Sequence, residues 1–218
     1  MKKQLLAGLL VSATLVGIGL SGGLSASAAV IDSVDTEVGI GFTGHGGGTP
    51  GPLEIKWAPL KLDFQNANEV NTVVQAFPEI AGNKKYVVVS DTRAGATDEW
   101  KVTAQLTDLK NAKNTETLTG AILKFDSALK GYEGVNAPEA PGSIVAPGAR
   151  TATVPPASQV AAGGAAVKVM EDGTGSVGTF QGASAMEMDN IALEVPANAA
   201  KAGEQYTGTL TWSLDDVI

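Results

Sequence analysis

The chain has 218 residues and a formal net charge of −8, with 44% hydrophobic residues, 27 glycines and 10 prolines. It contains no cysteine and one histidine, which excludes disulfide scaffolds, thiol catalysis and multi-histidine metal sites. Its 15 basic residues against 23 acidic ones argue against a nucleic-acid partner, because phosphate contacts need clustered cations. No cofactor is expected.

The first 28 residues have the three parts of a secretory signal peptide. Lys2 and Lys3 supply the positive start, residues 5–20 form an apolar run, and residues 26–28 read Ala-Ser-Ala, a small-x-small cleavage pattern. The apolar run is short for a membrane span. We therefore expect residues 1–28 to be removed on export, leaving a secreted mature chain without a transmembrane anchor. No Leu-Pro-x-Thr-Gly sequence follows, so we expect any attachment to the cell to be non-covalent.

Residues 29–52 are predicted to form a flexible, glycine-rich lead-in. The run at 39–52 is dominated by glycine and proline, and ordering such a run costs much chain entropy. His45 lies in this run and is expected to be mobile and exposed. Asp32, Asp35 and Glu37 precede it, but their spacing lacks the glycine and the final glutamate of an EF-hand loop, so no metal site is expected.

From residue 53 onward, short strand-like runs dominate the sequence. Most of them alternate apolar and polar residues with a period of two, which is typical of half-buried strands, and glycine-containing turns separate them. The sequence therefore predicts one all-β domain over residues 53–218, an antiparallel β-sandwich or barrel-like fold with long Gly/Pro-rich loops. The runs lie at residues 53–57, 60–64, 86–89, 100–106, 122–126, 191–195 and 206–214.

Three further segments carry local predictions. Residues 69–77 are compatible with one turn of helix. Residues 136–156 hold five prolines and are predicted to form a long loop, because proline cannot donate to a sheet ladder. Such a loop is a place where ligand contacts commonly occur. Asp91 and Arg93 are expected to tie a loop together through charge-assisted hydrogen bonds.

Two tryptophans are followed, two positions later, by a branched aliphatic residue: Trp100 by Val102, and Trp212 by Leu214. In a strand, positions i and i+2 point to the same side, so each pair shares a face. The alternation favours a place in the core, where an indole buries a large apolar area. The alternative is that both indoles are exposed and stack on the sugar rings of a cell-wall glycan. The opposite face near the second pair is a row of hydroxyls, either solvated or bound to glycan: Thr207, Thr209, Thr211 and Ser213.

With these motifs the sequence resembles the WxL-domain surface proteins of low-GC Gram-positive bacteria. The resemblance covers residues 30–218 and is also carried by the runs at 60–64, 86–93 and 191–196. The first motif has Val102 where leucine would be expected. The family implies non-covalent attachment to the cell wall through peptidoglycan, assembly with other surface proteins, and a place at the cell surface. It makes Trp100, Val102, Trp212 and Leu214 the candidate wall-binding residues.

The expected function is therefore binding without catalysis. An alternative is an adhesin that contacts host matrix or other cells through the loop at 136–156. A wall hydrolase would need two inward carboxylates in a cleft, and nothing in the sequence favours that arrangement.

Overall fold

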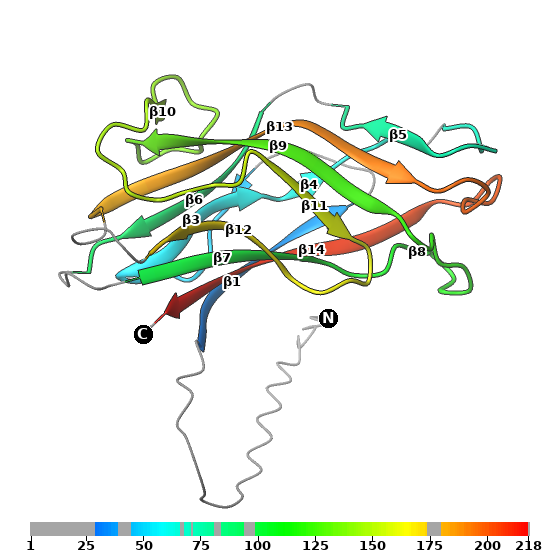
Figure 1. Cartoon of the computed structure of the whole chain (residues 1–218), viewed down its shortest axis with the longest axis horizontal. Coiled ribbons are helices and arrows are strands. Elements are labelled where there is room, and N and C mark those ends of the chain that lie inside the picture. The colour runs from blue at the N-terminus through cyan, green and yellow to red at the C-terminus, as the bar shows by residue number, and fades with distance from the viewer. Residues whose placement is uncertain are drawn as a thin grey trace, which may run out of the picture.

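The computed structural model describes residues 29–38, 45–65, 68–70, 72–80, 84–93, 99–173 and 180–217. In this part of the chain the secondary structure is all-β, and the strands form two sheets that face each other (Figure 1). The predicted all-β sandwich is thereby confirmed. The predicted signal peptide lies outside the described residues.

The first sheet carries the two tryptophan motifs and has six strands within the described residues. Its order is β12-β7-β14-β1-β4, with β8 beside β14, and every pair is antiparallel except β1 with β4. The strands are β1 (Ala29–Val38), β4 (Lys61–Leu62), β7 (Glu99–Leu106), β8 (Lys110–Asn111), β12 (Val167–Asp172) and β14 (Tyr206–Val217).

The second sheet has eight strands over the same described ranges. Its order is β10-β9-β13-β6-β3-β2, with β11 beside β9 and β5 beside β13. The strands are β2 (His45–Gly46), β3 (Leu53–Pro59), β5 (Gln75–Pro78), β6 (Lys85–Asp91), β9 (Ile122–Tyr132), β10 (Ile144–Val145), β11 (Ala157–Ala161) and β13 (Gly182–Val195).

The main core fills the space between the two sheets. Alternate residues of β7 and β14 are buried, from Trp100 to Leu106 and from Leu210 to Leu214. They join one cluster with buried residues of the facing sheet, among them Val87, Leu123 and Phe125. The period-two pattern in the sequence reflects this arrangement, because each strand has one face in the core and one in water.

Strand β1 departs from the prediction of a flexible lead-in over residues 29–52. It pairs along its length with β14, and Asp32, Val34, Thr36 and Val38 point into the structure. Two of these four inward residues are polar, so the apolar signal that marks a strand was weak. The Asp32 carboxylate is satisfied by the backbone N–H groups of Ile55 (2.8 Å), Thr49 (3.1 Å) and Ser33 (2.9 Å). Residues 39–44 lie outside the described part.

The other local predictions have mixed outcomes. The helical turn predicted over 69–77 is wrong: none of the described residues in this range is helical, and Gln75–Pro78 forms β5 against β13. The loop at 136–156 is confirmed except for the short strand β10, which pairs with the end of β9. The tie at Asp91 is also confirmed: the carboxylate accepts from Arg93 Nε (3.0 Å) and Nη2 (2.9 Å). Arg93 Nη1 also donates to Asp216 (2.6 Å), which joins β6 of one sheet to β14 of the other.

Candidate functional site

The two tryptophan motifs lie side by side on adjacent antiparallel strands. Leu214 of β14 is directly opposite Val102 of β7, and Trp212 is opposite Ala104. On its other side Trp212 is opposite Val34 of β1. The small Ala104 leaves room for the indole beside it. Two segments that are far apart in the sequence therefore build one patch of the core.

All four predicted site residues are buried in this patch. Trp100 is 2% exposed, and Val102, Trp212 and Leu214 are each 0% exposed. The Trp212 ring meets Phe125 of the facing sheet edge-on, with 6.5 Å between ring centroids. Stacking of either indole on a sugar would first require the sandwich to open, so the structure favours the core interpretation of both motifs.

The indole N–H groups of the two tryptophans have different surroundings. Trp212 Nε1 donates to Thr36 Oγ1 at 2.8 Å, and the Thr36 hydroxyl donates to the carbonyl oxygen of Pro59. This chain of bonds links β14, β1 and β3 across the core. Trp100 Nε1 is buried without a hydrogen-bond partner among the described residues. Of the two tryptophans, Trp212 is therefore the one whose N–H joins strands together.

The outer face of β14 carries the predicted hydroxyl row. Thr207 is exposed, and Thr209, Thr211 and Ser213 are partly exposed. The Thr211 hydroxyl donates to Asp35 of β1 at 2.6 Å, and the backbone N–H of Thr209 donates to the hydroxyl of Thr107 (2.9 Å). Part of the row is thus used in cross-strand bonds within the sheet.

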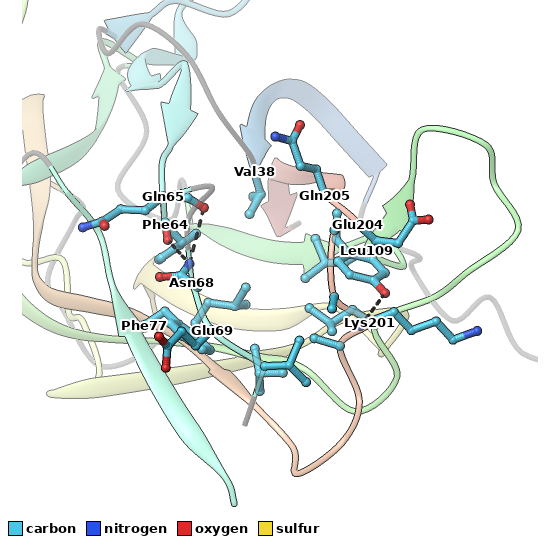
Figure 2. Close-up of a pocket in the computed structure, with 18 residues that line it drawn as sticks. Val38, Phe64, Gln65, Asn68, Glu69, Phe77, Leu109, Lys201, Glu204 and Gln205 are labelled. Atoms are coloured by element: carbon cyan, nitrogen blue, oxygen red, sulfur yellow. Dashed lines mark hydrogen bonds between the residues drawn. The ribbon is translucent and has the colours of Figure 1, made fainter. Parts of the chain in front are cut away.

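A cleft of about 210 Å³ opens at one end of the sandwich, between β5 and the start of β14. Its floor is apolar and is formed by the ends of strands from both sheets. Figure 2 shows Phe64, Asn68 and Phe77 on one side of the cleft and Leu109, Glu204 and Gln205 on the other. The floor and walls also include Val38, Leu118, Leu193, Val195, Ala200 and Tyr206.

Turns that need unusual backbone angles shape one wall of the cleft. The segment between β13 and β14 uses Asn198 (φ 59°) and Gly203 (φ 80°), both in the left-handed region that glycine and asparagine tolerate best. Gly208 allows a close crossing, because an added Cβ there would lie 2.8 Å from Leu109 and 3.2 Å from the Asp108 carbonyl oxygen. These turns bring Tyr206 and residues 201–205 to the cleft mouth.

Polar side chains surround the cleft mouth. Asn68 Nδ2 donates to the carbonyl oxygens of Phe64 (2.7 Å) and Gln65 (3.4 Å), which holds that segment in place (Figure 2). The Tyr206 hydroxyl accepts the backbone N–H of Lys201 at 3.2 Å. Glu204 accepts from Asn111 Nδ2 at 3.0 Å.

The rim charge is negative. The Lys201 ammonium pairs with Glu116 outside the cleft, and that hydrogen bond raises the pKa of Lys201. Glu69 and Glu204 contribute two carboxylates to the lining. The cleft thus combines an apolar floor, one half-buried phenol ring and a rim of amides and carboxylates, a composition that disfavours anionic ligands.

No motif in the sequence predicts this cleft. Phe64 and Tyr206 belong to strands that the alternation predicts, but the polar rim comes from loops whose spacing follows no motif. The cleft forms because β5, β8 and the turn at 196–205 meet at one end, which is a property of the topology. The local signal is a group of amide and acidic residues on each side of the cleft, which matches no binding motif: Gln65, Asn68 and Glu69, and Glu204 and Gln205.

His45 is buried, which corrects the prediction of a mobile, exposed side chain. Its side chain is 1% exposed; Nδ1 contacts Glu139, and Nε2 accepts the backbone N–H of Tyr86 at 3.0 Å. Burial lowers the pKa of His45, an effect that outweighs the opposing attraction of Glu139. Both ring nitrogens are occupied, so the ring is a structural link between β2, β6 and the loop that contains Glu139.

Tyr86 and Trp57 lie on the outer face of the second sheet. Burial and the neighbouring Glu187 raise the pKa of Tyr86 to about 12. Trp57 Nε1 donates to the Tyr132 hydroxyl (3.1 Å), which donates to the Asn136 carbonyl (2.6 Å). These rings form a small second cluster beneath the proline-rich loop.

Within the described residues no group of three or more His, Cys, Asp or Glu side chains is placed to hold a metal ion. Nor does that part of the chain contain a helix with the length and apolar character needed to cross a membrane.

A family model described as "WxL domain surface cell wall-binding" matches residues 30–217. The chain belongs to the WxL family. Its match takes in β1, both tryptophan motifs and the cleft, and it supports attachment to the cell wall at the cell surface. Comparison with curated proteins gives no match, and comparison with solved structures gives none either. The WxL motifs of this chain, Trp100 to Val102 and Trp212 to Leu214, are therefore parts of the domain core.

Proposed function

We propose that this WxL domain attaches non-covalently to peptidoglycan, with the cleft at the end of the sandwich as the main contact. The observation that supports this most directly is the burial of both motifs. Because Trp100 and Trp212 fill the core, wall contact must come from another surface that they help to shape. The cleft is a concave, partly aromatic surface on which the motif strand β14 begins.

A single small cleft would bind weakly, and the polymeric nature of the wall compensates for this. Each protein molecule next to a wall strand meets many identical repeats at high local concentration, so rebinding is fast. Retention then needs no covalent bond. In this proposal the tryptophans act as positioning residues, because they hold β7, β14 and β1 in register and so fix the cleft wall.

The test is sedimentation of the purified protein with peptidoglycan freed of teichoic acids. We expect the protein to pellet with the wall, to remain bound at moderate salt because the contacts involve sugars and not ion pairs, and to release no soluble wall fragments. Protein that stays in the supernatant while a known wall binder pellets would contradict the proposal. Release of wall fragments would contradict a purely binding role.

The two interpretations of the motifs make different predictions in the same assay. If Trp212 is core, Trp212→Ala costs about 3–5 kcal/mol of folding free energy, and wall binding is lost only under conditions where the variant unfolds. If Trp212 contacted sugar, binding would be lost while the melting temperature stayed the same. The structure supports the first outcome.

Assembly with other surface proteins is the second part of the proposal. Four exposed aliphatic residues flank β5 in the sequence: Val70, Val73, Val74 and Ile80. Exposed aliphatic residues that gather on one surface are typical of protein contacts. We expect Val73→Ser with Val74→Ser to reduce cross-linking of the protein to neighbours in washed envelopes. Val30→Ser, a change at an exposed residue on β1, serves as the control.

Adhesion to host matrix through residues 136–156 is the alternative. The segment is exposed at Glu139, Pro141 and residues 146–149, and next to it Val135 is 86% exposed. Matrix binding that disappears when this loop is shortened, while wall sedimentation stays the same, would support the alternative.

A further inference from the structure

The cleft has a floor that suits methyl and ring C–H groups. Phe64, Leu109 and Val195 present almost only carbon to its interior, and each is largely buried. A ligand made entirely of hydroxyls would lose its hydration against this floor without replacing those bonds. The floor therefore calls for a ligand with at least one apolar group.

The rim sets the charge of that ligand. Lys201, the cation of the lining, is paired with Glu116, whereas Glu69 and Glu204 add negative charge at the mouth. The chain as a whole also carries a net charge of −8. Phosphate-bearing polymers such as teichoic acids would be repelled by this field, and a neutral ligand would not.

The rim also supplies hydrogen-bonding groups that can both donate and accept. Gln65, Asn68 and Gln205 carry amides, and the two glutamates carry acceptors. Tyr206 adds a half-buried ring whose hydroxyl is held by the backbone N–H of Lys201, so the ring is fixed in orientation. A fixed aromatic face beside amides and carboxylates can hold a pyranose ring.

We propose that the cleft binds one N-acetylated amino sugar of the glycan strand, with the acetyl methyl group on the apolar floor and the sugar ring against Tyr206. This inference rests on the proposed attachment to peptidoglycan and names the part of the polymer that is held. The cleft volume of about 210 Å³ accommodates a single sugar unit of this size. An acetamido group meets both requirements of the site, since it adds a methyl group and a neutral amide to a hydroxyl-bearing ring.

The proposal is tested with soluble probes of known structure. Binding of the N-acetylglucosamine tetramer to the purified protein is measured by calorimetry and compared with cellotetraose, which has similar rings without the acetamido group. We expect the acetylated tetramer to bind at least tenfold more tightly. Equal binding of the two sugars, or tighter binding of a free stem peptide or of a glycerol-phosphate polymer, would overturn the assignment.

Matched variants locate the site. Tyr206→Ala should weaken binding of the acetylated tetramer at least tenfold, whereas Tyr206→Phe keeps the ring, loses only the hydrogen bond that orients it, and should weaken binding much less. Ala200→Trp fills the cleft from a partly buried lining position and should abolish binding. Melting temperatures confirm that each variant is folded. Unchanged sugar binding by folded Ala200→Trp would overturn the location.

The same variants separate this proposal from the proposed function. If the unmodified protein and Ala200→Trp both pellet with peptidoglycan, wall attachment holds and the cleft assignment fails. If the unmodified protein does not pellet, wall attachment itself fails. If the unmodified protein pellets and Ala200→Trp does not, both are supported.

Discussion

At the scale of single residues, the most informative contact is the one between Trp212 and Thr36. A buried threonine that accepts from an indole and donates to a backbone carbonyl satisfies two polar groups inside an apolar core. The motif tryptophan thus needs a specific neighbour on β1. Sequence spacing predicted that Trp212 and Leu214 share a face, but the identity of Thr36 as partner depends on the pairing of β1 with β14.

The Trp212–Thr36 contact leads to a prediction for a double-mutant cycle. Thr36→Val keeps the side-chain volume but leaves the indole N–H unpaired, and should cost about 1–3 kcal/mol in the free energy of unfolding. Trp212→Phe removes the donor. The two changes together should cost less than their sum, because the second removes the group that the first leaves unsatisfied. Urea unfolding measures all four proteins.

Trp100 provides the control for this cycle. Its N–H has no partner among the described residues, so Trp100→Phe should cost less than Trp212→Phe, and it should add to Thr36→Val without coupling. Coupling between Trp100 and Thr36 of the same size as that between Trp212 and Thr36 would contradict the hydrogen-bond explanation.

At the scale of elements, one side chain makes several of the contacts that hold the proline-rich loop in place. Arg150 donates from Nε to the Ala183 carbonyl (2.7 Å), from Nη1 to Pro147 (3.1 Å) and from Nη2 to Tyr132 (3.4 Å). Its guanidinium also lies 4.8 Å from the centre of the Phe180 ring. The loop therefore rests on β9 and β13, although its composition alone predicted only an irregular segment.

We expect Arg150→Ala to release this loop while the sandwich stays folded. Limited proteolysis should then cut within residues 136–149 much faster than in the unmodified protein. Lys168→Ala removes an exposed ion pair with Glu171 and should leave the cleavage rate unchanged. Arg150→Lys should behave like the alanine variant, since an ammonium cannot satisfy three separated carbonyls.

A comparison of the strands shows which of them the hydrophobic alternation in the sequence predicts. Alternation located β7 and β14, because each of these strands has one apolar face in the core. It also located β3, although a register shift between Ile55 and Trp57 turns Trp57 to the outer face.

The alternation missed most of β13, because several residues on the outer face of this strand are buried as well. Ala185 packs in the second cluster, and the buried Glu187 accepts from Lys84 and Tyr86, so burial there does not follow a simple period. The cleft escaped prediction for a related reason, because it depends on which loops meet and not on the pattern of any one strand.

At the scale of the whole molecule, His45 makes stability depend on pH. Burial lowers its folded-state pKa below the ordinary 6.5, so the folded protein holds the neutral ring while the unfolded chain takes up the proton more readily. This contribution to stability is complete above pH 6.5 and is lost as the pH falls below it. Glu139 and Lys85 act on the ring with opposite effects, and Glu79 pairs with Lys85.

The expected outcome is a larger loss of stability between pH 7.5 and pH 5.5 in the unmodified protein than in His45→Gln. Glutamine can accept from the Tyr86 N–H and donate to Glu139 without titrating, and the carboxylates common to both proteins cancel in the comparison. Urea unfolding at the two pH values measures the difference. Equal losses would show that His45 does not titrate differently in the two states.

The pairing of β1 with β14 joins residues near position 30 to residues near position 215. The pairing of β1 with β14 in the first sheet can therefore form only after residues 206–217 have been synthesised. Until then, Val34 and Thr36 of β1 have no partner strand on the side that β14 will occupy. Such distant partners slow folding and keep the early chain open. A polypeptide built this way stays extended until the C-terminal strand has been synthesised, so the sandwich cannot close around β1 at an earlier stage.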